Sequence, residues 1–149
     1  MATSKFIARQ SAMQMLGRQR VSGGGKAAPR DLMERVRAGL PYSALESLMR
    51  TLSLTREEAS ASLSVPARTL ARRKREHKLS AEESDRLFRL ARVAARATEV
   101  LGKTESAAKW LRAPNRALGG AAPLSVLDTD PGAQEVEQIL GRIEWGVFS

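Results

Sequence analysis

The chain has 149 residues and a formal net charge of +9, and 42% of its residues are hydrophobic while only 4% are aromatic. A chain of this length can bury a core, and an apolar content carried by Ala and Leu favours helices over sheets. The absence of cysteine excludes disulfides, thiolate nucleophiles and nearly all structural zinc patterns, as expected of a cytoplasmic protein. Neither a signal peptide nor a membrane span is evident. We therefore expect an all-α cytoplasmic protein without metal or cofactor.

The charge is unevenly distributed along the chain. Residues 1–96 contain 20 Lys and Arg against 9 Asp and Glu, a net charge of +11. Residues 97–149 contain 5 Lys and Arg against 7 Asp and Glu, a net charge of −2. This asymmetry predicts two functions, one of them on a polyanion.

The first 29 residues are polar and basic and end in "SGGGKAAP", a composition typical of a flexible linker. We expect a mobile arm here. A weak helical pattern leaves open that part of the arm docks or becomes ordered on a partner; it runs through Phe6, Ile7, Met13 and Leu16.

Short amphipathic helices are predicted from Asp31 onward. "DLMERVRAGLP" predicts a helix that begins at or just before Asp31 and ends at residues 39–41. "YSALESLMRTLSL" predicts a second helix whose apolar face is formed by Leu45, Leu48, Met49 and Leu52. A capping box of Thr55 and Glu58 predicts the start of a third. Pro66, a residue type preferred at the first helical turn, predicts the start of the fourth.

The third and fourth helices, joined by "LSVPA", have the dimensions of a helix-turn-helix. The side chains expected in its core are Ala59, Leu63, Val65 and Leu70. Small Ser60 and Ser64 are expected where the two helices approach each other.

The fourth helix is strongly basic. Arg68, Arg72 and Arg75 follow helical spacing and would present three guanidinium groups on one face, where they could reach phosphates or guanine edges. The predicted DNA-binding residues are Arg68, Thr69, Arg72, Arg73, Lys74 and Arg75. The alternative is that the charges form only a solvated helix face. His77 is assigned no role beyond a helix C-terminal cap. Because a single helix-turn-helix binds weakly, a homodimer on operator DNA is expected.

A long helix is predicted to follow, with a capping box of Ser80 and Glu83 at its start and Gly102 at its end. Shorter helices are predicted after Thr104, which should cap the first of them, and over "PLSVLDT". A last helix is predicted whose inward-facing side chains are Val136, Ile139, Leu140 and Ile143. The predicted domains are a flexible arm (1–29), a helix-turn-helix domain (30–79), a connecting helix (80–102) and a C-terminal domain (103–149).

The stretch "WLRAPNRALGGAAPLSVLDTDPG", residues 110–132, is rich in turn-forming residues, and Trp110 is large enough to anchor a packed loop. Together with the last helix it resembles the C-terminal toxin-binding domain of Xre/MbcA/ParS antitoxins. The matching positions are Trp110, Leu111, Pro114, Asn115, Leu118, Gly119, Pro123, Leu124, Gly132, Val136, Leu140, Ile143 and Gly146. "LSVPARTLARRKREHKLSAEESDRLFRLARV" is similar to the same family's helix-turn-helix and connecting helix. The resemblance covers roughly residues 40–149 and leaves residues 1–30 outside.

The resemblance implies an antitoxin that neutralises a cognate toxin and represses its own operon. Such toxins are commonly of the RES class, which consumes NAD or transfers ADP-ribose from it. The toxin would be contacted by Trp110, Asn115, Arg116, Leu118, Trp145, Val147, Phe148 and Ser149. The tail "RIEWGVFS" would lie against the toxin's active site, because aromatic anchors dominate interface energies. Trp145 could equally belong to the core, and the tail could simply be frayed.

Two other functions remain to be distinguished. The chain could be a plain transcription regulator whose C-terminal domain dimerises or senses a ligand. An enzyme is disfavoured, because the sequence has one histidine, no cysteine and no Gly-rich phosphate loop after a strand.

Overall fold

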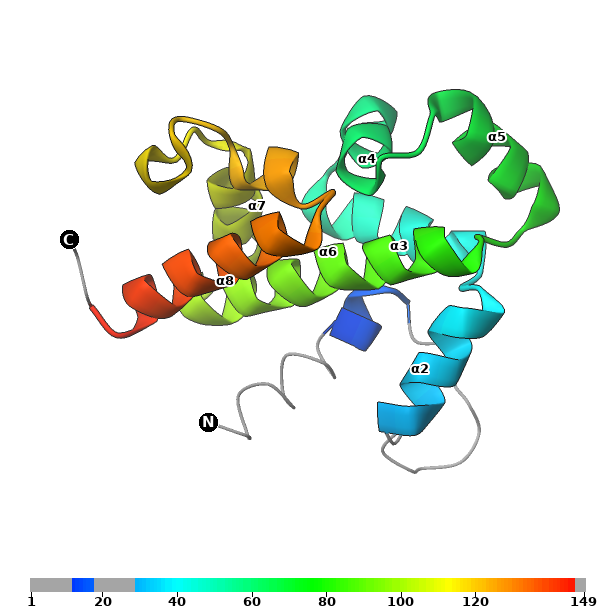
Figure 1. Ribbon diagram of the computed structural model, residues 1–149, viewed down its shortest axis with the longest axis horizontal. Coiled ribbons are helices and arrows are strands. Elements are labelled where there is room, and N and C mark those ends of the chain that lie inside the picture. The colour runs from blue at the N-terminus through cyan, green and yellow to red at the C-terminus, as the bar shows by residue number, and fades with distance from the viewer. Residues whose placement is uncertain (1–11, 18–28, 147–149) are drawn as a thin grey trace.

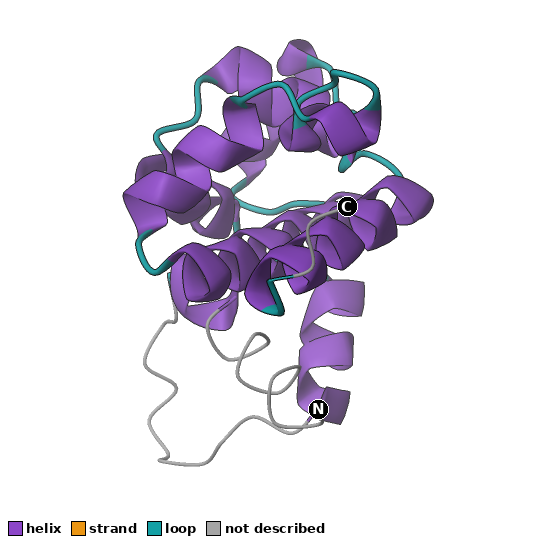
Figure 2. Cartoon of the chain, turned by 90° about the vertical axis from the view of Figure 1, so that its left-hand side faces the viewer, coloured by secondary structure: helices purple, strands orange, loops and turns teal. Residues whose placement is uncertain are grey.

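The computed structural model describes residues 12–17 and 29–146, and these residues form helices and no strand (Figures 1 and 2). The all-α prediction is therefore confirmed for them. The elements are α2 (Pro29–Ala38), α3 (Tyr42–Leu52), α4 (Arg56–Leu63), α5 (Ala67–Glu76), α6 (Ala81–Leu101), α7 (Thr104–Arg112), the 3₁₀ turns η1 (Arg116–Leu118) and η2 (Pro123–Val126), and α8 (Asp130–Glu144). A single helical turn covers residues 12–15.

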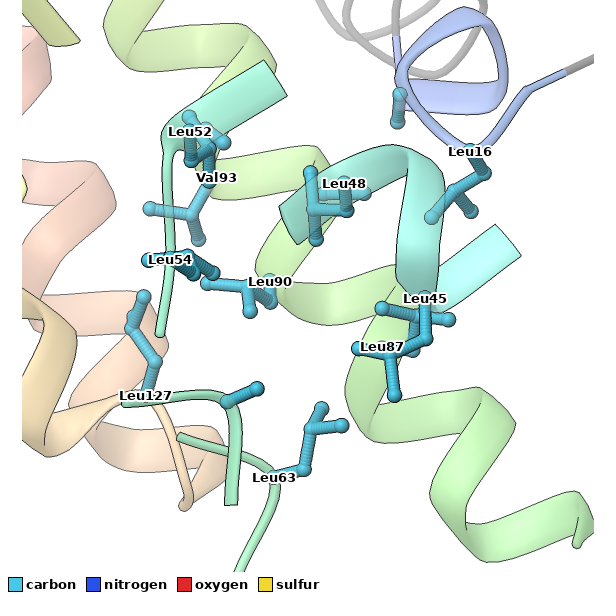
Figure 3. Packing of buried hydrophobic residues seen from close by; sticks show 14 of the residues in the cluster. Leu16, Leu45, Leu48, Leu52, Leu54, Leu63, Leu87, Leu90, Val93 and Leu127 are labelled. Atoms are coloured by element: carbon cyan, nitrogen blue, oxygen red, sulfur yellow. The ribbon is translucent and has the colours of Figure 1, made fainter. Parts of the chain in front are cut away.

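The 21-residue helix α6 is the central element of the fold. It packs against α2, α4, α7 and α8, and α8 runs alongside it in the same direction (Figure 1). Its buried side chains include Leu87, Leu90 and Val93, which belong to the same buried cluster as Leu45 and Leu48 of α3 (Figure 3). The buried cluster continues from the N-terminal residues to α8, so both halves of the chain share one hydrophobic core.

A close backbone crossing holds the ends of α2, α5 and α6 together. The backbone N–H of Leu79 donates to the carbonyl of Leu40 at 2.9 Å, and the N–H of Leu40 donates to Ser84 Oγ at 2.7 Å. Gly39 makes this crossing possible, because its φ is +94° and a Cβ there would lie 2.4 Å from the carbonyl oxygen of Leu79.

Part of the expected N-terminal arm is packed against the core. Ala12 is fully buried, Leu16 is 5% exposed, and Ser47 Oγ donates to the carbonyl of Met15 at 2.9 Å. Docking, the less favoured alternative, is therefore correct for residues 12–17. Phe6 and Ile7 lie outside the described residues.

Most predicted helix boundaries agree with the structure. Both capping boxes are present, with reciprocal hydrogen bonds between Thr55 and Glu58 and between Ser80 and Glu83, and Gly102 ends α6 in the left-handed conformation. Thr104, however, is the first residue of α7 and does not cap it, because the N-cap is Lys103 and makes no side-chain hydrogen bond. Pro66 likewise precedes α5 as its N-cap.

Candidate functional site

The α4–turn–α5 pair is built as predicted. Ser64 ends α4 with a left-handed φ of 52°, and Ser60 Oγ donates to the carbonyl of Val65 at 2.5 Å. Leu63, Val65 and Leu70 are all buried. The sequence predicts Ser64 at the close approach of the two helices, but its side chain is exposed. Its role is instead to reverse the chain direction.

The basic face of α5 is open to solvent. Of the predicted DNA-binding residues, Arg68, Arg72, Lys74 and Arg75 are exposed and Thr69 is half-buried. Thr69 also lines a hollow of about 460 Å³ between the turn and the start of α6. His77 follows α5 as its C-cap with a left-handed φ of 60°. An exposed row of arginines on the second helix of such a pair is the arrangement that reaches the major groove of DNA.

Arg73 differs from its neighbours on α5. Its Nε donates to Glu83 Oε1 at 2.8 Å and its Nη2 to Glu83 Oε2 at 3.2 Å, while Nη1 donates to Glu76 at 3.0 Å. Only 21% of the Arg73 side chain is exposed. The structure therefore directs Arg73 to α6, away from the open face to which the sequence assigned it.

Glu83 has two partners at once. Besides Arg73, it accepts a hydrogen bond from the backbone N–H of Ser80 at 2.8 Å. Burial raises the pKa of its carboxyl group, but the hydrogen bonds from Arg73 and Ser80 outweigh burial, and the pKa is lower than its ordinary value. The sequence revealed the capping box but not the arginine, because no local spacing links positions 73 and 83.

Residues 113–122, which we call the Pro-Asn-Gly loop, close on themselves through Asn115. Its backbone N–H donates to the carbonyl of Ala121 at 3.0 Å, and its carbonyl accepts from Gly120 at 2.9 Å. Its side-chain oxygen accepts from the N–H of Ala117 at 3.0 Å. Asn115 therefore shapes this loop from within.

The other predicted residues of this region lie in different environments. Trp110 and Leu118 are half-buried and pack against the core, whereas Arg116 is exposed. Trp145, which follows the last residue of α8, is 71% exposed, so the alternative that it belongs to the core is wrong. Val147, Phe148 and Ser149 lie outside the described residues.

Three arginines of α6 fasten α8 alongside it. Arg89 pairs with Asp130 at 3.2 Å and Arg92 with Glu137 at 2.9 Å, and Arg96 forms a third pair with Glu144. The hydrogen bond from Arg96 lowers the pKa of Glu144. Since Glu144 precedes Trp145, these pairs hold the end of α8 and thereby the start of the tail.

The comparisons with known proteins agree with this geometry. Residues 31–92 match the model of an antitoxin Xre-like helix-turn-helix domain, and residues 96–146 match the antitoxin Xre/MbcA/ParS C-terminal toxin-binding domain. An antitoxin Xre of Yersinia enterocolitica is 32% identical over 120 residues, which cover 79% of this chain and 81% of the relative. The chain belongs to the Xre/MbcA/ParS family of antitoxins.

Other relatives of this antitoxin extend the comparison. An antitoxin Xre of Pseudomonas putida is 40% identical over 83 residues, 55% of this chain and 52% of that protein. A Sphingobium protein that is named Prs ADP-ribosylating antitoxin is 27% identical over 134 residues, which cover 83% of this chain and 84% of that protein. A chain of the crystal structure of the M. tuberculosis MbcT–MbcA toxin–antitoxin complex matches with a TM-score of 0.54 and 26% identity, covering 72% of this chain and 96% of that chain.

A contact between α7 and α4 is among those that join the two matched regions of the antitoxin. Arg112, the last residue of α7, donates from Nε to Glu58 Oε2 at 2.8 Å and from Nη2 to Glu58 Oε1 at 3.0 Å, and Nη2 also donates to the carbonyl of Ser53. The hydrogen bond from Arg112 lowers the pKa of Glu58. The Pro-Asn-Gly loop therefore directly follows a residue that is bonded to the first helix of the helix-turn-helix.

Gly132 shows why the start of α8 requires a glycine. A Cβ at this position would lie 1.9 Å from the carbonyl oxygen of Val126, so the first turn of α8 can pack on η2 only without a side chain. Its N–H donates to Thr129 Oγ1, the N-cap of α8, at 3.2 Å. The sequence marked Gly132 only through the family resemblance.

The described part of the antitoxin contains no helix with the length and apolar character of a membrane span. Within the same residues, no group of three or more His, Cys, Asp or Glu side chains is arranged to hold a metal ion.

Proposed function

We propose that this antitoxin neutralises a cognate toxin through residues 103–149 and represses its own operon through α5. The observation that carries the proposal is the separation of the two surfaces. The basic helix α5 and the C-terminal end of α8, which carries Trp145, lie at opposite ends of the molecule (Figure 1). Each lies within the part that matches the corresponding family model. One chain can then bind a polyanion and a protein without direct competition for the same side chains.

The toxin-binding surface is proposed to centre on Trp145 and the tail residues Val147, Phe148 and Ser149. Supporting this is the 71% exposure of Trp145, because a large apolar side chain held in water is typical of an interface anchor. Arg116 is proposed as a direct contact from the Pro-Asn-Gly loop. Asn115 would shape that loop from within, and Trp110 and Leu118 would fix it to the core. The toxin is proposed to be of the RES class and to consume NAD, and the tail to cover its active site.

The DNA-binding surface is proposed to consist of Arg68, Thr69, Arg72, Lys74 and Arg75. All of these side chains are exposed or half-exposed on one helix, and arginine suits both phosphate contacts and the guanine edge. A homodimer would supply two such helices to two half-sites about one helical turn apart.

The proposed neutralisation is tested by co-expressing this antitoxin with the product of the adjacent gene. We expect the two proteins to co-purify and the cellular NAD level to be preserved. A chain truncated before Val147 should still fold and bind DNA but should protect NAD poorly. An equally protective truncated chain would contradict the role of the tail, and an adjacent product that neither binds the chain nor consumes NAD would contradict the proposed toxin.

We further propose that the antitoxin acts by binding and catalyses no reaction. Since one relative carries ADP-ribosylating in its name, the isolated chain should be tested for that activity directly. With NAD as substrate, we expect neither hydrolysis nor transfer of ADP-ribose to a protein; turnover that scales with the concentration of the pure chain would contradict this.

A further inference from the structure

Helix α5 is weakly anchored in the hydrophobic core. Leu70 is its only buried residue, and the backbone contact that holds the helix lies at its C-terminal end, where the N–H of Tyr42 donates to the carbonyl of the C-cap His77 at 3.2 Å. One buried leucine and a contact at one end fix the position of a helix but leave its rotation about the helix axis and its tilt poorly restrained. Sequence reading of DNA requires this orientation to be fixed, because side chains must meet base edges with hydrogen-bonding geometry.

The Arg73–Glu83 pair supplies the missing restraint. Two hydrogen bonds of 2.8 and 3.2 Å join the planar guanidinium of Arg73 in α5 to the carboxylate of Glu83 in α6. Such a two-point contact fixes angle as well as distance. The carboxylate is itself held in place, since Glu83 is 6% exposed and also accepts a hydrogen bond from the N–H of Ser80. Of the described Asp and Glu residues, Glu83 is the only one that is buried.

We propose that Glu83, acting through Arg73, is a positioning residue for DNA recognition: it sets the angle at which α5 presents its open basic face. This inference rests on the proposed DNA-binding function of α5. It also reassigns Arg73, which stabilises the orientation of the helix from behind and does not contact phosphate. Arg72, the preceding residue, has a side chain that is 53% exposed and belongs to the open face.

The test uses the Glu83→Gln variant with Glu58→Gln as its matched control. Both glutamates are the fourth residue of a capping box and both bind one arginine in a bidentate manner, but only Glu83 binds an arginine of α5. Glutamine retains the cap, so each helix start is preserved. Both substitutions remove one negative charge, which by itself favours DNA binding.

Binding is measured on a duplex from the region upstream of the antitoxin's own gene, over a series of salt concentrations. We expect Glu83→Gln to weaken binding on the order of tenfold, the loss that corresponds to a displaced base contact, with an unchanged salt slope. Glu58→Gln should bind like the wild type. Arg73→Met should resemble Glu83→Gln. Wild-type affinity in Glu83→Gln, or a salt slope reduced by about one unit in Arg73→Met, would overturn the inference.

A second measurement needs no DNA. Amide hydrogen exchange of the free protein should show faster exchange over residues 67–76 in Glu83→Gln than in Glu58→Gln, because α5 loses its second anchor. Unchanged protection of α5 would overturn the positioning role. If the wild-type chain binds no DNA, the proposed repression fails, while the exchange data still decide whether Glu83 holds α5.

Discussion

Glu58 of α4 and Arg112 of α7 form a two-point ion pair at 2.8 and 3.0 Å, although 54 positions separate them in the sequence. The pair joins the capped start of the first helix of the helix-turn-helix to the residue that precedes the Pro-Asn-Gly loop. The side chains are 28% and 34% exposed, so water screens the pair only in part.

The first prediction is that this pair contributes to the stability of the whole fold. In a double-mutant cycle of Glu58→Gln and Arg112→Met, we expect a coupling free energy of about 0.5 to 1.5 kcal/mol from urea unfolding, in the range of contacting side chains. DNA affinity should change little. A coupling energy near zero would mean that the pair contributes no net stability.

The second prediction concerns Trp145. Because its side chain is largely in water, Trp145→Ala should change the free energy of unfolding by less than about 0.5 kcal/mol. The same substitution should weaken toxin binding by about 2 kcal/mol or more, measured by calorimetry. Trp110→Ala is the contrasting variant: because Trp110 packs against the core, its loss should cost about 2 kcal/mol of stability. Undiminished toxin affinity in Trp145→Ala would remove this residue from the interface.

The third prediction compares two glycines of α8. Gly132→Ala should destabilise the fold by about 2 kcal/mol or more, since the new Cβ would lie 1.9 Å from the Val126 carbonyl oxygen. Gly141→Ala should instead stabilise it by about 0.5 to 1 kcal/mol, because nothing lies within 4 Å of a Cβ there and alanine favours helix. Thermal unfolding of both variants decides between these opposite signs. Equal effects would show that helix propensity alone controls both sites.

The fourth prediction is a pH dependence of stability. The pKa values of Glu58 and Glu83 are both lower in the folded protein than the ordinary value of 4.5. The unfolded chain therefore binds protons first as the pH falls, so the stability from these groups is present above that value and is lost as the pH drops through their folded pKa values. The stability difference between the wild type and the Glu58→Gln/Glu83→Gln double variant should shrink between about pH 6 and about pH 3. Melting temperatures that stay equally far apart across this range would contradict it.

The fifth prediction separates contact from orientation on α5. Arg72→Gln removes a side chain that is 53% exposed, and its ion pair with Glu76 is long, at 3.6 Å, and solvent-exposed. We expect the salt slope of operator binding to fall by about one unit if the lost contact is to phosphate. If the contact is to guanine, binding should weaken by about 1 to 3 kcal/mol at a single base position. Unchanged binding would mean that Arg72 belongs only to a solvated face.

What the sequence determined by itself is local. Hydrophobic spacing, capping boxes and turn residues act over a few positions, so they predicted most of the helices, the helix-turn-helix core of Leu63, Val65 and Leu70, and the basic helix. The expectation of a toxin-binding domain came from the family resemblance, because rules about residue spacing carry no information about a partner.

Only the tertiary structure decided which side chains are available. Arg72 and Arg73 are adjacent and chemically identical, yet Arg73 is bound by Glu83 of α6 while the side chain of Arg72 is largely exposed to water. In the same way, Trp110 packs against the core while Trp145 is exposed, and residues 12–17 dock although their composition predicted a mobile arm. The physical reason is that ion pairs and burial depend on neighbours brought together by packing, and positions ten or fifty residues apart carry no local signal of that proximity.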